Sequence, residues 1–224
     1  RQEIIDLDSR MLGECERILT NARNTATRLQ RFNGIAARPL YHPPPIADRL
    51  REGRYGNYVL VVARLEPLKR VDLAIRAMAH VPAPMRLVVV GDGSERAALE
   101  RAAAQSGAGD RIEFAGAVWG DAVARLYADA LAVLYAPFDE DYGYVTLEAF
   151  LAAKPVITAT DSGGPLEFVV DGTNGFVCAP EARALAAAVG RLAADRALAA
   201  RLGRAGRSVA QAITWDGVIE QLLG

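Results

Sequence analysis

Residues 135–157 read YAPFDEDYGYVTLEAFLAAKPVI, and this stretch predicts the end of a strand, an acidic loop, a helix and a second strand. The apolar run at residues 130–135 is typical of a strand, and Pro137 with the acidic residues after it ends that strand. Gly143 permits a turn, and residues 146–151 then favour a helix. This order of elements is typical of a ligand site at the carboxyl end of a parallel sheet.

Two glutamates in this stretch are candidate ligand contacts. Glu140 lies in the acidic loop and Glu148 in the first turns of the helix, so both carboxylates are expected to point toward one crevice and to accept hydrogen bonds from sugar hydroxyls. The backbone amides of Gly143, Tyr144 and Val145 are expected at the start of the helix, where a phosphate would bind. A ligand that carries both sugar hydroxyls and phosphate would satisfy all of these groups.

Apolar runs alternate with helical stretches from residue 57 onward. The apolar runs are continuous rather than alternating, which indicates strands covered on both faces. The order of elements predicts an α/β fold, a doubly wound parallel sheet with a helical C-terminal tail. Strands are expected at residues 57–63, 85–90, 111–115, 130–135, 155–159 and 175–178, and helical stretches at 71–80, 94–105, 122–128, 146–153, 165–170, 183–194, 197–210 and after Trp215.

Residues 1–50 follow a different pattern. Helices are expected at 2–14 and 24–32 and extended segments at 17–21 and 38–42, before three consecutive prolines at 43–45 that predict a stiff linker. Two α/β units are too few for a domain, so we interpret them as the tail end of one. The chain starts at Arg1 rather than methionine, already in a helical pattern, and we expect it to be part of a longer protein.

The bulk composition excludes several classes of function. The chain has 224 residues, 51% of them hydrophobic, and a net charge of −1, which argues against nucleic acid as the main partner. Cys15 and Cys178 give neither a disulfide framework nor a metal-binding spacing, and His42 and His80 are expected on the surface or in loops. No apolar run is long enough for a membrane span. We expect a cytoplasmic protein and leave open a peripheral contact with the inner face of the membrane.

Two further loops carry residues suited to a nucleotide. Arg64 and Lys69 follow the strand at 57–63, on the rim expected to hold Glu140, where both cations would bind phosphate oxygens. Gly91 and Gly93 follow the next strand, but the third glycine of a dinucleotide fingerprint is missing, so we interpret them as a tight turn that lets a ligand approach. The loop that ends at Val118 is either a backbone contact for a base or a plain connection.

Over residues 57–206 the chain resembles the C-terminal, donor-binding half of the retaining GT-B glycosyltransferases of family 4 (glycosyl transferases group 1), so the sheet is expected to be a Rossmann-like half of a GT-B fold. The resemblance is carried by Arg64-Leu65 with Lys69, Gly91-Asp92-Gly93, Phe114-x-Gly116, Glu140 and Glu148 around Gly143, Lys154-Pro155-Val156-Ile157, and Gly163-Gly164-Pro165 with Glu167. It implies that Arg64 and Lys69 contact the donor diphosphate and Glu140 the transferred sugar. Glu148 would then hold the ribose.

The resemblance also implies a division of the chain. Residues 1–50 would be the tail of the acceptor-binding domain with its linker, 51–205 the donor-binding domain, and 206–224 a crossover helix. The sequence departs from the family pattern at three positions: Asp141 replaces a small residue, Tyr142 a common phenylalanine, and Ala153 a frequent glycine.

The function implied is transfer of a hexose, such as mannose, from a UDP-sugar or GDP-sugar to a glycan, lipid-linked or small-molecule acceptor, with a role in polysaccharide biosynthesis as one option. We expect no metal requirement, because neither an Asp-x-Asp motif nor a histidine cluster suggests a metal site and a fixed cation pair can serve instead. The missing part of the N-terminal domain would be a partner of this chain. Three alternatives stay open: an NAD-dependent dehydrogenase, a nucleotide-sugar epimerase, and a non-catalytic domain that keeps the donor pocket.

Overall fold

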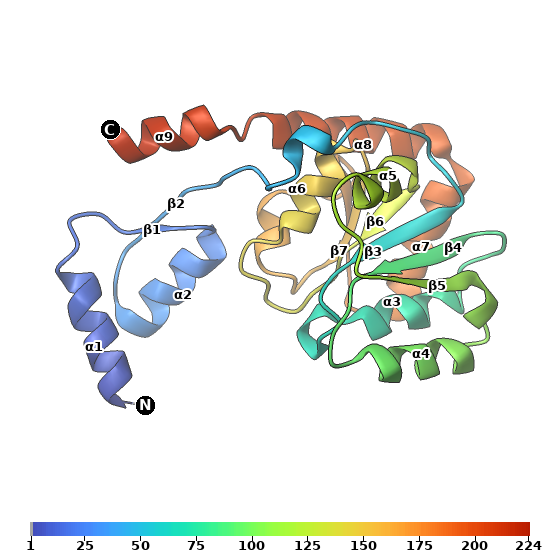
Figure 1. Cartoon of the computed structure of the whole chain (residues 1–224), viewed down its shortest axis with the longest axis horizontal. Helices are drawn as coiled ribbons and strands as arrows, with labels where there is room; N and C mark the ends of the chain where they lie inside the picture. The colour runs from blue at the N-terminus through green and yellow to red at the C-terminus, as the bar shows by residue number, and fades with distance from the viewer. Residues whose placement is uncertain (1) are drawn as a thin grey trace.

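The computed structural model describes residues 2–224 and contains a six-stranded parallel sheet with helices on both faces (Figure 1). The strand order is β5-β4-β3-β6-β7-β8, so the order reverses between β3 and β6. This confirms the predicted doubly wound α/β fold. The strands are β3 (Tyr58–Val62), β4 (Arg86–Val90), β5 (Ile112–Gly116), β6 (Ala132–Leu134), β7 (Val156–Ala159) and β8 (Gly175–Cys178).

Each face of the sheet has its own apolar core. Val59 and Val61 of β3 belong to one core, while Leu60 between them belongs to the other. Both layers exclude water, which is why β3 is apolar at every central position. The helices that cover the sheet or follow it are α3 (Val71–Met78), α4 (Arg96–Gln105), α5 (Asp121–Asp129), α6 (Tyr144–Leu151), α7 (Ala182–Ala194), α8 (Arg196–Gln211) and α9 (Trp215–Leu223).

The prediction of a helix at residues 165–170 is wrong. A short 3-10 turn, η4 (Gly164–Glu167), stands there, and irregular backbone follows it. The buried side chain of Asn174 donates to the carbonyl of Phe168 (2.9 Å) and accepts from the amide of Val170 (2.8 Å). These bonds satisfy backbone groups that would otherwise be paired within a longer helix. The segment therefore forms a loop around the Asn174 side chain instead of a helix.

Gly143 and Ala153 are two of several positions near the site with a positive φ. Gly143 (φ 78°) precedes α6, and a Cβ there would lie 3.0 Å from the ring of Tyr135, so glycine suits the position for both reasons. Ala153 also has a positive φ (55°), a conformation that favours glycine, the residue that the resemblance leads one to expect here. An alanine in this conformation costs roughly 1 kcal/mol.

The N-terminal segment forms a separate small unit (Figure 1). It consists of α1 (Gln2–Gly13), α2 (Arg23–Asn33) and a two-stranded parallel sheet of β1 (Leu19–Thr20) and β2 (Arg38–Pro39). The last helix, α9, returns to this unit, where Arg17 donates to the carbonyls of Gln221 and Leu222. The domain boundaries expected from the sequence stay a prediction.

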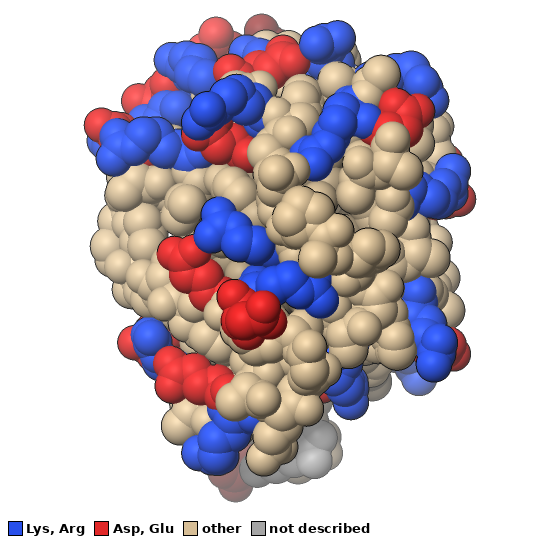
Figure 2. All heavy atoms as spheres, turned by 90° about the vertical axis from the view of Figure 1, so that its right-hand side faces the viewer, with Lys and Arg blue, Asp and Glu red and all other residues tan. Residues whose placement is uncertain are grey.

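Surface charge is mixed rather than segregated. Figure 2 shows cationic and acidic side chains interspersed on one face of the molecule, in keeping with the net charge of −1. Within residues 2–224, no helix is long and apolar enough to cross a bilayer.

Candidate active site

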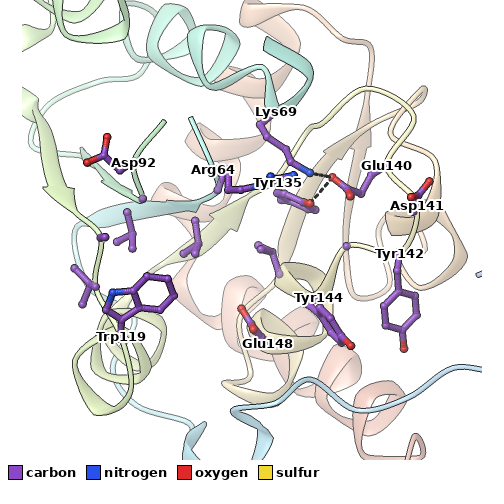
Figure 3. A pocket seen from close by; sticks show the side chains of 18 of the residues that line it. Arg64, Lys69, Asp92, Trp119, Tyr135, Glu140, Asp141, Tyr142, Tyr144 and Glu148 are labelled. Carbon is purple, nitrogen blue, oxygen red and sulfur yellow. Dashed lines mark hydrogen bonds and ion pairs between the residues drawn. The ribbon is translucent and has the colours of Figure 1, made fainter. Parts of the chain in front are cut away.

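A cleft of about 690 Å³ lies at the carboxyl ends of β3, β4, β5 and β6 (Figure 3). It therefore occupies the point where the strand order reverses, the usual ligand position in a doubly wound sheet. Nine of the ten residues proposed from the sequence line it: Arg64, Lys69, Gly91, Val118, Glu140, Gly143, Tyr144, Val145 and Glu148.

Gly93, the tenth, does not line the cleft. A Cβ at Gly93 would lie 2.4 Å from the carbonyl oxygen of Leu65, and one at Gly91 would lie 1.8 Å from that of Ala63. Both glycines are therefore explained by the close approach of the turn after β4 to the loop after β3. Only Gly91 also faces the cleft.

The charged end of the cleft is organised around Glu140. Lys69 Nζ forms an ion pair with Glu140 Oε2, and the hydroxyl of Tyr135 donates to the same oxygen at 2.8 Å (Figure 3). Burial, reinforced by the Glu140 carboxylate, raises the pKa of Tyr135 well above its usual value. Tyr135 therefore keeps its proton and fixes the orientation of the carboxylate. Arg64 lies beside this group, with a largely exposed side chain that pairs with Glu66 at 3.4 Å.

Glu148 enters the cleft from α6. Its Oε2 accepts a hydrogen bond of 2.6 Å from Tyr127, which is buried on α5. Burial raises the pKa of Glu148 above its usual value, and the bond from Tyr127 opposes that shift. One carboxylate oxygen is thus committed to Tyr127, and the other remains for a ligand.

The start of α6 faces the same space. Gly143, Tyr144 and Val145 line the cleft, and among the described residues no side chain caps this helix. The first amides of a helix lack partners within it and carry the positive end of its dipole. The cleft therefore combines two cationic side chains and a helix start with four carboxylates, those of Asp92, Glu140, Asp141 and Glu148.

The opposite end of the cleft is largely apolar, although Asp92 also lies there (Figure 3). Val62, Val90, Ala117, Val118 and Trp119 line it. Trp119 is 81% exposed, and in Figure 3 its ring lies across the cleft from Lys69 and Glu140. This end offers a flat aromatic surface and backbone groups, which suit a planar heterocycle.

A second layer of contacts holds the loops in place. Arg70 donates to both oxygens of Asp161 (2.9 and 2.7 Å) and to the carbonyls of Ala136 and Pro137 (2.8 and 2.7 Å). These hydrogen bonds lower the pKa of Asp161 below its usual value. Arg70 thereby ties the loop that carries Lys69 to the one that carries Glu140.

Several residues of the site were not predicted from the sequence. Tyr135 ends the predicted strand, and its position beside the acidic loop was a usable signal. Tyr127 and Trp119 gave no such signal, because only the fold brings them to Glu148 and to the rim.

His42, expected on the surface or in a loop, lies in the linker, where its ring stacks on Trp215 and its Nδ1 is 3.0 Å from the hydroxyl of Tyr144. Within residues 2–224 no cluster of three or more His, Cys, Asp or Glu side chains is arranged to hold a metal ion.

The amino-acid sequence of the chain matches one family of known proteins. The family model described as "Glycosyl transferases group 1" matches residues 47–209. The D-inositol 3-phosphate glycosyltransferase of Acidothermus cellulolyticus is 34% identical over 182 residues, which cover 75% of this chain and 40% of that protein. Human alpha-1,3/1,6-mannosyltransferase ALG2 is 29% identical over 80% of this chain and 47% of its own. The chain thus spans about half the length of the curated relatives it matches.

Solved structures share the fold. Anabaena Alr3699/HepE in complex with UDP and glucose superimposes with a TM-score of 0.89 at 22% identity, covering 100% of this chain and 66% of that one. Sucrose-phosphate synthase from Thermosynechococcus elongatus gives a TM-score of 0.88 at 24% identity, covering 99% of this chain and 60% of that one.

Proposed function

The chain belongs to the glycosyl transferases group 1 family, and we propose that it supplies the donor site of an enzyme that transfers a sugar from a nucleoside diphosphate sugar. One observation carries this proposal: Arg64, Lys69 and the start of α6 share a single cleft with Glu140 and Glu148. A nucleoside diphosphate sugar needs cations and amides at its centre and hydroxyl acceptors on both sides. A volume near 690 Å³ is in the range that encloses a ligand of this size.

The donor would lie along the cleft with its base at the apolar end. The base would rest near Val118 and Trp119, with the ribose hydroxyls on Glu148. The diphosphate would then reach Arg64, Lys69 and the amides of α6. The transferred sugar would meet Glu140, whose carboxylate is already oriented by Lys69 and Tyr135.

The difficult step is departure of the diphosphate from the sugar carbon. Negative charge grows on the leaving phosphate, and cations fixed in advance stabilise it in the transition state more than in the bound donor. We assign this task to Arg64, Lys69 and the helix start, and we expect no metal requirement. Glu140 is assigned to the sugar hydroxyls rather than to nucleophilic attack, and front-side attack with retention follows as part of the proposal.

One relative bears on the sugar class. Its name specifies a mannosyltransferase, which supports a hexosyl donor, whereas the name of the D-inositol 3-phosphate glycosyltransferase states no transferred sugar. The structure solved with UDP and glucose belongs to a protein of the same fold and supports a nucleoside diphosphate as ligand. The choice between UDP and GDP and among glycan, lipid-linked and small-molecule acceptors stays open. A role in polysaccharide biosynthesis, a cytoplasmic location and contact with the inner membrane face stay predictions.

Calorimetric titration of the chain with UDP, GDP and NAD tests the proposal. We expect one of the nucleoside diphosphates to bind, NAD not to bind, and Arg64→Ala to weaken the binding at least about tenfold, because it removes a charge-assisted phosphate contact. Arg101→Ala, on the distant helix α4, is the control and should bind as the unmodified chain does. Binding of NAD alone would instead support the dehydrogenase alternative.

A further inference from the structure

The segment before the proline linker contacts the loop that carries Glu140. The side-chain amide of Asn24, in the first turn of α2, donates to the backbone carbonyl of Glu140 and to Asp139 Oδ1, both at 2.9 Å. Asn24 and Glu140 are 116 positions apart, so the contact joins the small N-terminal unit to the donor side of the cleft. Arg28, one turn further along α2, adds ion pairs to Asp139 and Asp141 of the same loop.

Asn24 is itself held in place by Glu167. The two carboxylate oxygens of Glu167 accept from the backbone amides of Arg23 (2.9 Å) and Asn24 (2.7 Å), and the hydroxyl of Tyr41 donates to one of them at 2.6 Å. The residue before the helix, Ala22, has no side chain able to cap it, so Glu167 supplies the missing acceptor from η4. The start of α2 is thereby fixed against the donor-side fold.

The backbone of Glu140 is held from two directions. Its amide donates to the carbonyl of Ser162 (3.1 Å), and its carbonyl accepts from the amide of Gly164 (2.7 Å) as well as from Asn24. Gly163 lies between these partners, where a Cβ would be 2.5 Å from the Glu140 carbonyl oxygen and 2.7 Å from the Asn24 side chain. The loop after β7 holds one side of Glu140, and Asn24 holds the other.

We propose that Asn24 is a positioning residue for Glu140, through which the segment before the proline linker sets how firmly the cleft binds the transferred sugar. This inference rests on the proposed function, since it assigns Glu140 to the sugar. The base and ribose contacts lie elsewhere in the cleft. Lys69, assigned to the diphosphate, pairs with the Glu140 side chain, whereas Asn24 bonds to the Glu140 backbone carbonyl. Loss of the Asn24 donor therefore weakens recognition of the sugar while recognition of the nucleotide persists.

The test compares the affinity of the chain for a nucleoside diphosphate with that for its sugar derivative, using UDP with UDP-glucose and GDP with GDP-mannose, whichever pair binds. In Asn24→Asp the donating amide becomes an acceptor that faces the Glu140 carbonyl and Asp139. The new carboxylate would be repelled by Asp139 and by Glu167, which accepts from the backbone amide of Asn24, so this variant disturbs the contact most strongly. Asn24→Ala removes the donor without adding charge, and Thr27→Ala, at an exposed position of the same helix, is the matched control.

We expect Asn24→Asp to shift the ratio of the two dissociation constants against the sugar nucleotide by about tenfold, and Asn24→Ala by about threefold, as for the loss of a partly buried hydrogen bond. The dissociation constant for the nucleoside diphosphate should stay within about twofold in both variants, and Thr27→Ala should change neither constant. Glu140→Gln should produce the same kind of shift. In the double variant Asn24→Asp/Glu140→Gln the shifts should not add, since Asn24 acts through Glu140.

Two results would overturn the inference alone: an unchanged ratio in Asn24→Asp beside a shifted ratio in Glu140→Gln, or full additivity in the double variant. If nucleoside diphosphates bind but Glu140→Gln leaves the ratio unchanged, the role of Glu140 fails and the inference fails with it. If no nucleoside diphosphate binds the unmodified chain, the proposed function itself is wrong.

Discussion

Lys69 and Glu140 form an ion pair inside the cleft, and each side chain is only 17% exposed. The pair keeps both charges compensated at a position where burial of a lone charge would be costly. A donor diphosphate would give Lys69 a second anionic partner, and the sugar hydroxyls would give Glu140 new donors. The pair therefore prepares the cleft for a ligand that is anionic at one point and rich in hydroxyls next to it.

Replacement of Lys69 is expected to weaken nucleotide binding. Lys69→Met should reduce affinity for the preferred nucleoside diphosphate by roughly 10- to 100-fold, the effect of losing a charge-assisted bond worth about 1.5–3 kcal/mol. Only two of the 26 cationic residues are lysine, and the others are arginine. The presence of lysine at this enclosed position indicates that the site favours a compact ammonium over a guanidinium. Lys69→Arg should therefore also lose affinity. Calorimetry checks both variants, and Arg76→Ala, on the exposed side of α3, should bind normally.

Nucleotide binding should depend on pH through Glu148. Its carboxylate must be ionised to accept two ribose hydroxyls, and burial raises its pKa above the usual 4.5. As the pH falls from neutral through this raised pKa, Glu148 takes up a proton and affinity decreases, before an exposed carboxylate would titrate. Glu148→Gln should bind more weakly at neutral pH, and its affinity should not show the decrease that protonation of Glu148 causes in the unmodified chain. The phosphate groups titrate equally in both proteins, so parallel pH profiles would contradict the assignment.

Trp119 should report the arrival of the base. The chain has two tryptophans, and the other, Trp215, stacks on His42 in the linker. In Trp215→Phe we expect fluorescence quenching on addition of the preferred nucleoside diphosphate, and in Trp119→Phe, which retains Trp215, little change. Trp119→Ala should also weaken binding by about 1 kcal/mol, the lower end for a base stacked on an aromatic ring. Equal quenching in both single-tryptophan variants would place the base elsewhere.

Lys154 should make stability rise with pH. Its ammonium is fully buried, donates to the carbonyl of Arg54 at 2.7 Å and lies 3.8 Å from the centre of the Tyr55 ring. Burial lowers the pKa of Lys154 from 10.5 to about 8. Between these two values the folded protein releases a proton that the unfolded chain keeps, so the free energy of unfolding increases as the pH rises.

The matched variant for this effect is Lys154→Met, which keeps the length of the side chain without the charge. Urea unfolding at pH 7 and pH 10 should show the unmodified chain gaining on the order of 2 kcal/mol relative to the variant. Ionisation of distant tyrosines affects both proteins alike and cancels in the difference. A difference that stays constant between the two pH values would show that Lys154 remains charged throughout.

The sequence predicted those parts of the site that depend on local pattern. The apolar runs, the glycine before α6 and the positions of Arg64 and Lys69 all follow from strand-to-helix connections, and the carboxyl ends of parallel strands must meet at one edge. The start of α6 was expected at residue 146 but lies at Tyr144, because Gly143 in its left-handed conformation lets the helix begin directly after it.

The remaining contacts could not be predicted, because side chains far apart in the sequence make them. Tyr127 reaches Glu148 across 21 positions, and Glu167 reaches Asn24 across 143. No periodicity encodes such pairs; they depend on how helices pack on the finished sheet. The same holds for the loop at residues 168–174. There the buried side chain of Asn174 binds the backbone of a segment that was expected to be helical.

A crystal structure of the chain with UDP or GDP bound tests the central claim most directly. We predict diphosphate oxygens within about 3.2 Å of Lys69 Nζ and of the Tyr144 backbone amide, with the ribose at Glu148 and the base at the Trp119 end of the cleft. A nucleotide seated elsewhere, such as the shallow groove on α2 lined by Arg23 and Arg31, with the main cleft left empty, would contradict it.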